Sequence, residues 1–330
     1  MRKPTGGRIQ ASPELGRTVV QITMSEPQIL VLGSINMDLV VRGDQLPVAG
    51  ETVIGGEFFQ VSGGKGANQA VAAARSSNSP VVLIAASGSD PFGQQLRSEL
   101  ARENLCMDFV FQIQDEPTGV ALILVDGNGE NCISVAPGAN ARLDPAHLDQ
   151  LGDQAWPSAG VFLASLESPL KTVARGIDLA RQHGMTTILN PAPAHPDLLD
   201  QPLMKQLDLI TPNRHEAELL SGIAVDDLES AVAAGRRIQQ CGPSQVIITL
   251  GAEGAVVIDQ QVHKLPAMAV DAVDSTAAGD CFNGVLAVAL AEKQDLLTAA
   301  HWAIKAAGIC VTRRGAQPSL PTRGQIDNGG

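Results

Sequence analysis

Short, continuous apolar runs recur along this chain, and stretches of helical periodicity separate them. The apolar runs cover residues 28–33, 81–86, 161–164, 186–189, 207–211 and 246–250. The helical stretches cover residues 66–75, 93–103, 169–183 and 228–240. An apolar run without polar alternation suits a strand that is buried on both faces, as in a parallel sheet. The alternation therefore predicts an α/β fold, a doubly wound and mostly parallel sheet flanked by helices.

Two regions interrupt this rhythm. Residues 51–61 and 119–135 have the pattern of exposed antiparallel strands, and the second contains the strong hairpin-turn signal Asp126-Gly127-Asn128-Gly129. We expect a small β-sheet lid over the ends of the parallel strands, built from about residues 38–61 and 107–135. Residues 27–330 would then form a single domain. Residues 1–26 are polar without a clear period, which predicts a poorly ordered N-terminal extension.

Charge and cysteine usage argue against several classes of protein. The net charge of −12 argues against nucleic acid or an anionic membrane as the partner. Five scattered cysteines without a Cys-x-x-Cys pair favour free thiols in a reducing compartment over disulfides or a zinc site. No apolar run reaches the ~18 residues that span a bilayer. We therefore expect a cytoplasmic protein. It should have a large core, since 44% of its 330 residues are hydrophobic.

The segment at residues 274–284 predicts a phosphate-binding helix start. Ala277, Ala278 and Gly279 precede an apolar, alanine-rich helix, so an anion could reach the unpaired backbone N–H groups there. Asp280 would lie beside that anion, where a carboxylate is unfavourable unless it takes a proton from a nucleophile. This combination indicates phosphoryl transfer to a hydroxyl. The alternative is that Asp280 is an ordinary helix cap.

Two polar segments follow predicted strands and suit the binding of a polyol. Asn36 and Asp38 would point the same way from an extended chain, toward neighbouring sugar hydroxyls. Further on, Gly64 permits close approach of a ligand, and Lys65 and Asn68 supply hydrogen-bonding groups. This loop lacks the Ser or Thr that follows the lysine of a Walker A loop. The alternatives are a polar turn for the first segment and a flexible helix-entry loop for the second.

Two further segments favour nucleotide and metal binding, and a third supplies a single acid. Asn213 and Glu216 fall at i and i+3 of a predicted helix start, where an amide and a carboxylate can hold a hydrated Mg²⁺. The alternative is that the same pair forms a helix cap with its reciprocal partner. Glu167 is a lone acid at a strand end. Thr249 and Gly251 follow another predicted strand and would suit a nucleotide phosphate.

The order of these motifs resembles that of the ribokinase family of carbohydrate and nucleoside kinases. The resemblance runs from about Gln28 to about Pro321. The motifs that carry it are Gly33-Ser34-Ile35-Asn36-Met37-Asp38, Gly63-Gly64-Lys65-Gly66-Ala67-Asn68-Gln69-Ala70, Asn190-Pro191-Ala192-Pro193-Ala194, Thr211-Pro212-Asn213 and Ala277-Ala278-Gly279-Asp280. Two departures are mild: Ser275 stands where the family usually has Thr, and Cys310 stands where Ala is common.

The resemblance implies a role for each matching residue. Asp280 is the expected catalytic base. The expected anion hole for the phosphoryl group comprises Ala277, Ala278 and Gly279. The expected ribose contacts are Asn36, Asp38, Gly64, Lys65, Asn68 and Glu167, together with Asp280. The expected nucleotide-binding positions are Asn213, Thr249, Gly251 and Gly279. Glu216 is expected to organise Mg²⁺ through water. The expected ligands of an activating monovalent cation, usually potassium, are Asp274, Thr276, Cys310, Arg313, Gly315 and Ser319.

The resemblance further implies ATP-dependent phosphorylation of D-ribose at its 5-hydroxyl, with Mg²⁺ and K⁺ as cofactors. A kinase for another sugar or a nucleoside, such as fructose or deoxyribose, stays open, as does a non-catalytic sugar- or nucleotide-binding regulator. The lid sheet would have an exposed edge and the apolar residues Phe58, Phe59, Val120 and Ile123, and such an edge invites pairing with another chain. A homodimer through the lid is therefore expected, as the family also implies.

Overall fold

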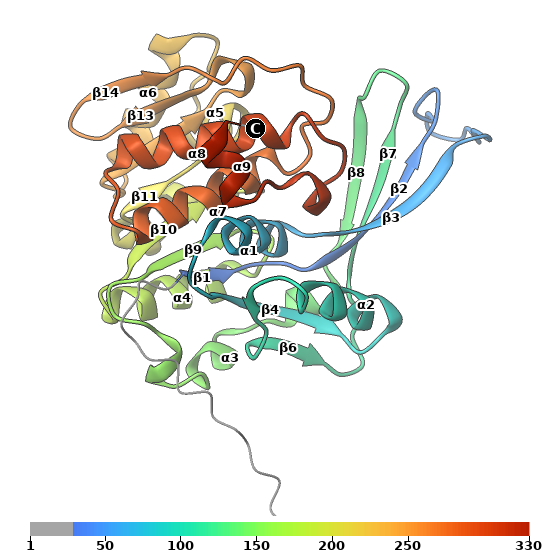
Figure 1. Ribbon diagram of the computed structural model, residues 1–330, viewed down its shortest axis with the longest axis horizontal. Coiled ribbons are helices and arrows are strands. Elements are labelled where there is room, and N and C mark those ends of the chain that lie inside the picture. Colours follow the sequence, from blue (N-terminus) through green and yellow to red (C-terminus); the bar gives the residue numbers. More distant parts are fainter. Residues whose placement is uncertain (1–28, 330) are drawn as a thin grey trace, which may run out of the picture.

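The computed structural model describes residues 29–329, so the predicted extension at residues 1–26 lies outside the described residues (Figure 1). A main sheet of ten strands has the order β14-β13-β12-β11-β10-β9-β1-β4-β5, with β6 also paired to β4. Its strands are β1 (Ile29–Leu32), β4 (Val81–Gly88), β5 (Leu105–Cys106), β6 (Val110–Ile113), β9 (Val161–Ser165), β10 (Thr186–Asn190), β11 (Leu209–Ile210), β12 (Gln245–Thr249), β13 (Ala255–Ile258) and β14 (Val262–Leu265). All pairs are parallel except those that join β13 to β12 and β14 to β13. The predicted mostly parallel sheet is confirmed.

Helices cover both faces of this sheet (Figure 1). One face carries α1 (Lys65–Ser76), α2 (Pro91–Leu100), α7 (Ala278–Ala291), α8 (Leu296–Cys310) and α9 (Arg323–Asn328). The other face carries α3 (Pro145–Asp149), α4 (Leu170–Gln182), α5 (Arg214–Ser221) and α6 (Leu228–Gln239). Along β1, Ile29 and Val31 enter the first core, whereas Leu30 and Leu32 enter the second. A strand that is buried on both faces explains the continuous apolar runs in the sequence.

Short 3-10 helices lie in the connections between these elements. They are η1 (Gly138–Arg142), η2 (Asp153–Ala155), η3 (Leu198–Asp200), η4 (Pro202–Gln206), η5 (Gly251–Glu253) and η6 (Gln317–Ser319). Within residues 29–329, every helix is too short or too polar to cross a bilayer.

A second, four-stranded sheet, the predicted lid sheet, projects from the main body (Figure 1). Its order is β3-β2-β7-β8, with β2 (Asn36–Arg42), β3 (Glu57–Gly63), β7 (Gly119–Val125) and β8 (Asn131–Ala136). The predicted hairpin turn joins β7 to β8, where Asp126 Oδ1 accepts from the N–H groups of Asn128 at 2.8 Å and Glu130 at 2.9 Å. The predicted small sheet is thus confirmed, although β3 begins only at Glu57.

The structure agrees with one sequence expectation and differs from others. Asn36 and Asp38 lie on an extended chain as expected, in strand β2, and the alternative of a polar turn is wrong, because β2 pairs along its whole length with both β3 and β7. The predicted lid segment at residues 107–135 is wrong at its start, because β6 pairs with β4 in the main sheet. The sequence also failed to predict β5, β13 and β14. These strands are short and lie near the sheet edges, where pairing with a neighbour stabilises a strand more than its own residue pattern does.

Candidate active site

A pocket of about 200 Å³ lies at the carboxyl ends of the central strands. Asn190 ends β10, Thr211 follows β11 and Thr249 ends β12, and all three line the pocket. The remaining lining residues are Lys65, Ala192, Asn213, Glu216, Ser275, Ala277, Ala278, Gly279, Asp280 and Asn283. Ligands of open α/β sheets bind at this edge, so the fold brings the predicted helix start to the expected place.

The start of α7 presents backbone N–H groups to this pocket. Ala277 precedes the helix with a φ of 61°, in the left-handed region, and its side chain makes no cap. The N–H groups of Ala277, Gly279 and Asp280 have no hydrogen-bond partner among the described residues. The N–H of Ala278, in contrast, donates to the Ser275 carbonyl at 3.2 Å. The unpaired amides and the helix dipole favour an anion here. Of the three predicted cradle amides, those of Ala277 and Gly279 are unpaired, and the amide of Asp280 joins them.

Asp280 lies in the first turn of α7 and does not cap it, so the capping alternative is wrong. Its Oδ2 accepts from Asn68 Nδ2 at 3.0 Å, and its Oδ1 accepts from Gln69 Nε2 at 3.1 Å. The side chain is only 7% exposed. Burial raises the pKa of Asp280, while the nearby charge of Lys65 and the two amide donors oppose that rise. The carboxylate therefore lies at the pocket wall, held from behind by α1.

Lys65 provides the positive charge among several acids. The Asp280 carboxylate raises the pKa of Lys65 more than burial lowers it, and Glu167 and Glu216 act in the same direction. Burial raises the pKa of Asp38 to about 7, and the charges of Glu167 and Asp280 add to this effect. One ammonium group thus faces four carboxyl groups, an arrangement that suits a ligand rich in hydroxyls.

Glu167 gathers the first predicted sugar motif. Its Oε2 accepts from the Ser34 hydroxyl, from the Lys65 N–H at 3.1 Å and from Asn36 Nδ2 at 3.4 Å. Gly64 has a φ of 90°, and a Cβ there would lie 2.7 Å from the backbone nitrogen of Asn36. Only glycine fits this position without strain. The structure therefore brings these predicted sugar contacts to one place.

Asn140 is a residue of this site that the sequence reasoning missed. It lies in η1, after the lid hairpin, and is 1% exposed. Its Nδ2 donates to Asn36 Oδ1 at 2.8 Å and to the Ile35 carbonyl at 3.0 Å, and its Oδ1 accepts from the Ile35 N–H at 3.0 Å. A Cβ at Gly119 would lie 2.3 Å from Asn140 Nδ2 and 2.3 Å from Asn36 Oδ1, so a side chain there would disturb this contact. The available signal was a polar residue where the chain returns from the hairpin.

Asn213 and Glu216 do form the helix cap of the alternative interpretation. The Glu216 N–H donates to Asn213 Oδ1, and the Asn213 N–H donates to Glu216 Oε2, both at 2.8 Å. Both residues also line the pocket, so the cap and a role in binding are compatible.

Burial raises the pKa of Glu216, and its Oε1 has no hydrogen-bond partner in the described part of the chain. Within residues 29–329, no group of three or more His, Cys, Asp or Glu side chains is arranged to hold a metal. These residues therefore fit Mg²⁺ only through water and phosphate oxygens.

Thr249 lies beside Asn213, because the Thr249 N–H donates to the Pro212 carbonyl at 3.0 Å. Gly251 begins η5 with a φ of 59°, next to the pocket and outside its lining. A Cβ at Gly251 would meet no atom within 4 Å, so this turn is open.

The six residues predicted for a monovalent cation lie in two adjoining segments, one before α7 and one from the end of α8 to η6. Asp274 joins the segments, since its Oδ1 accepts from the Thr276 N–H and its Oδ2 accepts from the Gly315 N–H, both at 2.9 Å. Cys310 Sγ lies 3.0 Å from Ser319 Oγ. The Arg313 N–H donates to the Cys310 carbonyl at 3.1 Å. Asp274 and Thr276 lie directly before α7, and the Asp274 contact with Gly315 ties the segment after α8 to this N-terminus.

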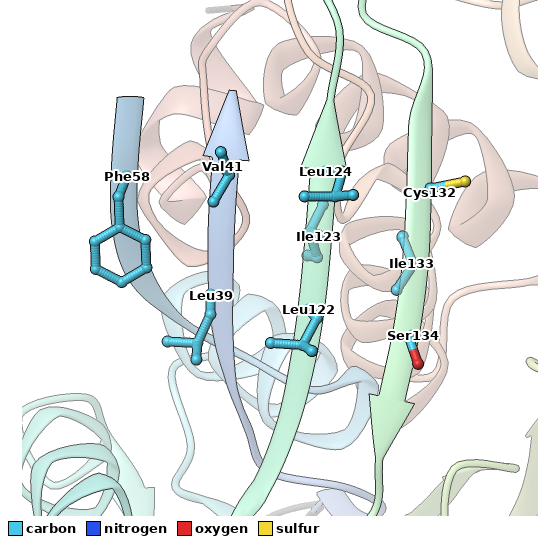
Figure 2. Close-up of a pocket in the computed structure, with 9 residues that line it drawn as sticks. All are labelled: Leu39, Val41, Phe58, Leu122, Ile123, Leu124, Cys132, Ile133 and Ser134. Atoms are coloured by element: carbon cyan, nitrogen blue, oxygen red, sulfur yellow. The ribbon is translucent and has the colours of Figure 1, made fainter. Parts of the chain in front are cut away.

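A second hollow, of about 510 Å³, lies on the lid sheet and is apolar. Figure 2 shows its lining residues, which are Leu39, Val41, Phe58, Leu122, Ile123, Leu124, Cys132, Ile133 and Ser134. Three of them are more than half exposed: Phe58 at 62%, Ile133 at 56% and Leu122 at 53%. Of the apolar lid residues expected from the sequence, Phe58 and Ile123 line this groove.

Known proteins resemble this chain over most of its length. Residues 26–323 match the pfkB family of carbohydrate kinases. A ribokinase of Haemophilus influenzae is 40% identical, with 89% of this chain and 95% of the relative covered. A deoxyribokinase of Salmonella typhi is 36% identical, with 91% and 97% covered. The structure of an Arabidopsis thaliana ribokinase complexed with ribose and ATP is similar with a TM-score of 0.79, at 28% identity, with 92% of this chain and 98% of that chain covered.

The relatives and the pocket agree in their chemistry. The match extends over the strand-end pocket, its helix start and the lid, which are the parts that a kinase for small hydroxyl compounds requires. The chain belongs to the pfkB family of carbohydrate kinases and is an ATP-dependent carbohydrate kinase of the ribokinase type.

Proposed function

We propose that this carbohydrate kinase transfers the γ-phosphoryl group of ATP to the 5-hydroxyl of D-ribose. The main support is the position of Asp280. Its carboxylate lies in the first turn of α7, beside unpaired backbone N–H groups and in the same pocket as Lys65. A base for a hydroxyl and a cradle for a phosphoryl group are thus adjacent, as in-line transfer requires.

Each group then has a defined task. Asp280 accepts the proton of the attacking hydroxyl as the new P–O bond forms and the bond to the leaving ADP oxygen breaks. The amides of Ala277 and Gly279 donate to the phosphoryl oxygens, where negative charge is greatest. Mg²⁺, when bound, neutralises phosphate charge, and Asn213 and Glu216 would hold it through water. A potassium ion would be held by the segments that contain Asp274, Thr276, Cys310, Arg313, Gly315 and Ser319.

The sugar would bind next to the end of the pocket that Lys65 and Asp280 line, since the other proposed contacts lie outside the pocket lining. Its proposed contacts are Asn36, Asp38, Gly64, Lys65, Asn68 and Glu167. Asn68 Oδ1 is buried and has no partner among the described residues, so it is available to a sugar hydroxyl. The lid strands β2 and β3 carry or flank this end, and the lid would exclude water during transfer.

The substitution Asp280→Asn tests the base. We expect kcat to fall by about 10²–10⁴, the usual contribution of a general base, with the KM values for sugar and ATP little changed. Steady-state kinetics with a coupled ADP assay measures both parameters. The exposed Asp226 makes no side-chain hydrogen bond in the described structure, so Asp226→Asn is the matched control. Near-normal turnover by the Asp280 variant would refute the assignment.

A second candidate is phosphorylation of a different sugar, and the Salmonella deoxyribokinase makes deoxyribose the first competitor to measure. Turnover with ribose, deoxyribose, fructose and nucleosides, with and without potassium, separates these activities. A higher kcat/KM for any sugar other than ribose would overturn the proposed substrate. Sugar binding without ATP consumption would instead support the regulator alternative.

We further infer a homodimer of single kinase domains, paired through the apolar lid groove, in the cytoplasm. The exposed Phe58 and Ile133 favour burial against a second copy. Phe58→Asp is expected to give monomers in light scattering, because a buried unpaired charge opposes association. The exposed Leu228 lies on α6, outside the lid, so Leu228→Asp is the control. A wild-type protein that stays monomeric at working concentration would contradict this assembly.

A further inference from the structure

The Asp280 carboxylate is held by two adjacent amides of helix α1. Asn68 donates to one oxygen at 3.0 Å, and Gln69 donates to the other at 3.1 Å. Asn68 is 6% exposed, and its Oδ1 is buried without a hydrogen-bond partner among the described residues. Gln69 is 0% exposed, so none of its side chain is open to a substrate. Gln69 therefore acts on Asp280 without touching a substrate.

The orientation of the Gln69 amide follows from its neighbours. The Thr211 carbonyl can only accept, so Asn190 must present its Nδ2 there, at 3.2 Å. The Asn190 oxygen then faces Gln69, which must present its Nε2, at 3.0 Å. The second hydrogen of that NH₂ group is directed at Asp280. Chemistry alone thus makes Gln69 a donor to the carboxylate.

The series of hydrogen bonds from Gln69 through Asn190 to Thr211 continues to the start of α7. The Thr211 hydroxyl donates to Asn283 Oδ1 at 2.6 Å, and Asn283 Nδ2 donates to the Gly279 carbonyl at 2.8 Å. This series of hydrogen bonds therefore joins the base to the helix turn that carries the unpaired amides. Gln69 is the residue of the series that contacts the carboxylate.

Close packing of α1 on α7 sets the distance between Gln69 and Asp280. A Cβ at Gly284 would lie 2.4 Å from the Gln69 carbonyl oxygen and 2.7 Å from the Ala72 Cβ. Only glycine permits this approach. The Gln69 Oε1 is buried without a partner among the described residues, and an unpaired buried oxygen costs free energy. An apolar side chain would avoid that cost if this position served only for packing.

We infer that Gln69 is a positioning residue, which holds the Asp280 carboxylate ionised and directs its remaining lone pairs toward the acceptor hydroxyl. The role depends on the proposed function of Asp280 as the base. The other titratable or charged groups around Asp280 come from several elements: Lys65 on α1, Asp38 on β2, Glu167 after β9, Glu216 on α5, and the thiols of Cys281 and Cys310.

The substitution Gln69→Met tests this role, because methionine has a similar length and no donor. We expect kcat to fall about 10-fold to 100-fold, as for the loss of a hydrogen bond to a charged group. The acid limb of the kcat profile should move to higher pH, since the carboxylate loses a donor and its pKa rises. The KM values for sugar and ATP should stay within about threefold, as the interaction lost acts only in turnover.

The matched control is Gln206→Met, because Gln206 also has an unpartnered amide oxygen but lies in η4, away from the pocket. Gly284→Ala provides an independent test, since the added methyl group pushes α1 away from α7 without removing a polar group. It should move the acid limb in the same direction. It also decides the question if Gln69→Met does not fold.

An unchanged kcat and acid limb in Gln69→Met would overturn the inference. So would a loss of kcat with an unmoved acid limb, since that result indicates a purely structural effect. If Asp280→Asn keeps normal turnover, the proposed function itself fails. If Asp280→Asn is inactive while Gln69→Met behaves as wild type, only the role of Gln69 fails.

Discussion

Asp38→Asn should make the ligand-free protein more stable while it weakens sugar binding. Asp38 is 8% exposed, and burial with the neighbouring charges of Glu167 and Asp280 raises its pKa from 3.8 to about 7. Each pKa unit corresponds to about 1.4 kcal/mol, so the ionised carboxylate lowers the free energy of unfolding by about 4 kcal/mol. Asparagine keeps the shape of the side chain and removes this charge.

The pH dependence follows from the direction of the shift. Below pH 3.8 the carboxyl group is protonated in both states and has no effect on stability. Between pH 3.8 and about 7 the unfolded chain ionises first, so stability is lost as the pH rises through this window. Asp38→Asn should therefore gain about 4 kcal/mol at pH 8 and only about 1.5 kcal/mol at pH 5.

Urea unfolding of the ligand-free protein at pH 5 and pH 8 measures this difference, with Asp226→Asn as the exposed control. Sugar titration should give an affinity lower by about 10-fold or more, since a charged hydrogen-bond acceptor is lost. A variant that is no more stable than wild type at pH 8 would refute the electrostatic reasoning. Equal gains at pH 5 and pH 8 would refute the pKa shift.

Two further substitutions test the surroundings of the site. Asn140→Asp should raise the sugar KM about 10-fold with little change in the KM for ATP, because Asn36 loses the donor that fixes its amide. Gly119→Ala should raise the sugar KM in the same way, because its methyl group would contact the Asn36 and Asn140 side chains. Unchanged sugar KM values in steady-state kinetics would contradict this role. Asp274→Asn should reduce the activation by potassium about 10-fold in a KCl titration. The reason is that Asp274 Oδ2, which accepts from the Gly315 N–H at 2.9 Å, can be replaced by an NH₂ group that cannot accept. Full activation by potassium would exclude this role.

The residue pattern was enough to predict the layers of the fold and the chemical content of the site. Runs such as Ile29–Leu32 are apolar on both sides, and only a doubly covered sheet buries both sides. The turn at Asp126 is local, so its residues alone predicted the hairpin. The small residues before Asp280 predicted a helix start with accessible amides, because backbone access depends on the side chains present there.

Tertiary structure decided which of these groups meet and how they are oriented. Asn68 and Gln69 lie more than 200 positions from Asp280 in the chain, and the contact depends on the close packing of α1 at Gly284. The sequence likewise gave no sign that Asn140 would orient Asn36 across 104 positions. Local patterns report the preference of a segment, whereas contacts between distant side chains depend on the packing of whole elements, which no single segment encodes.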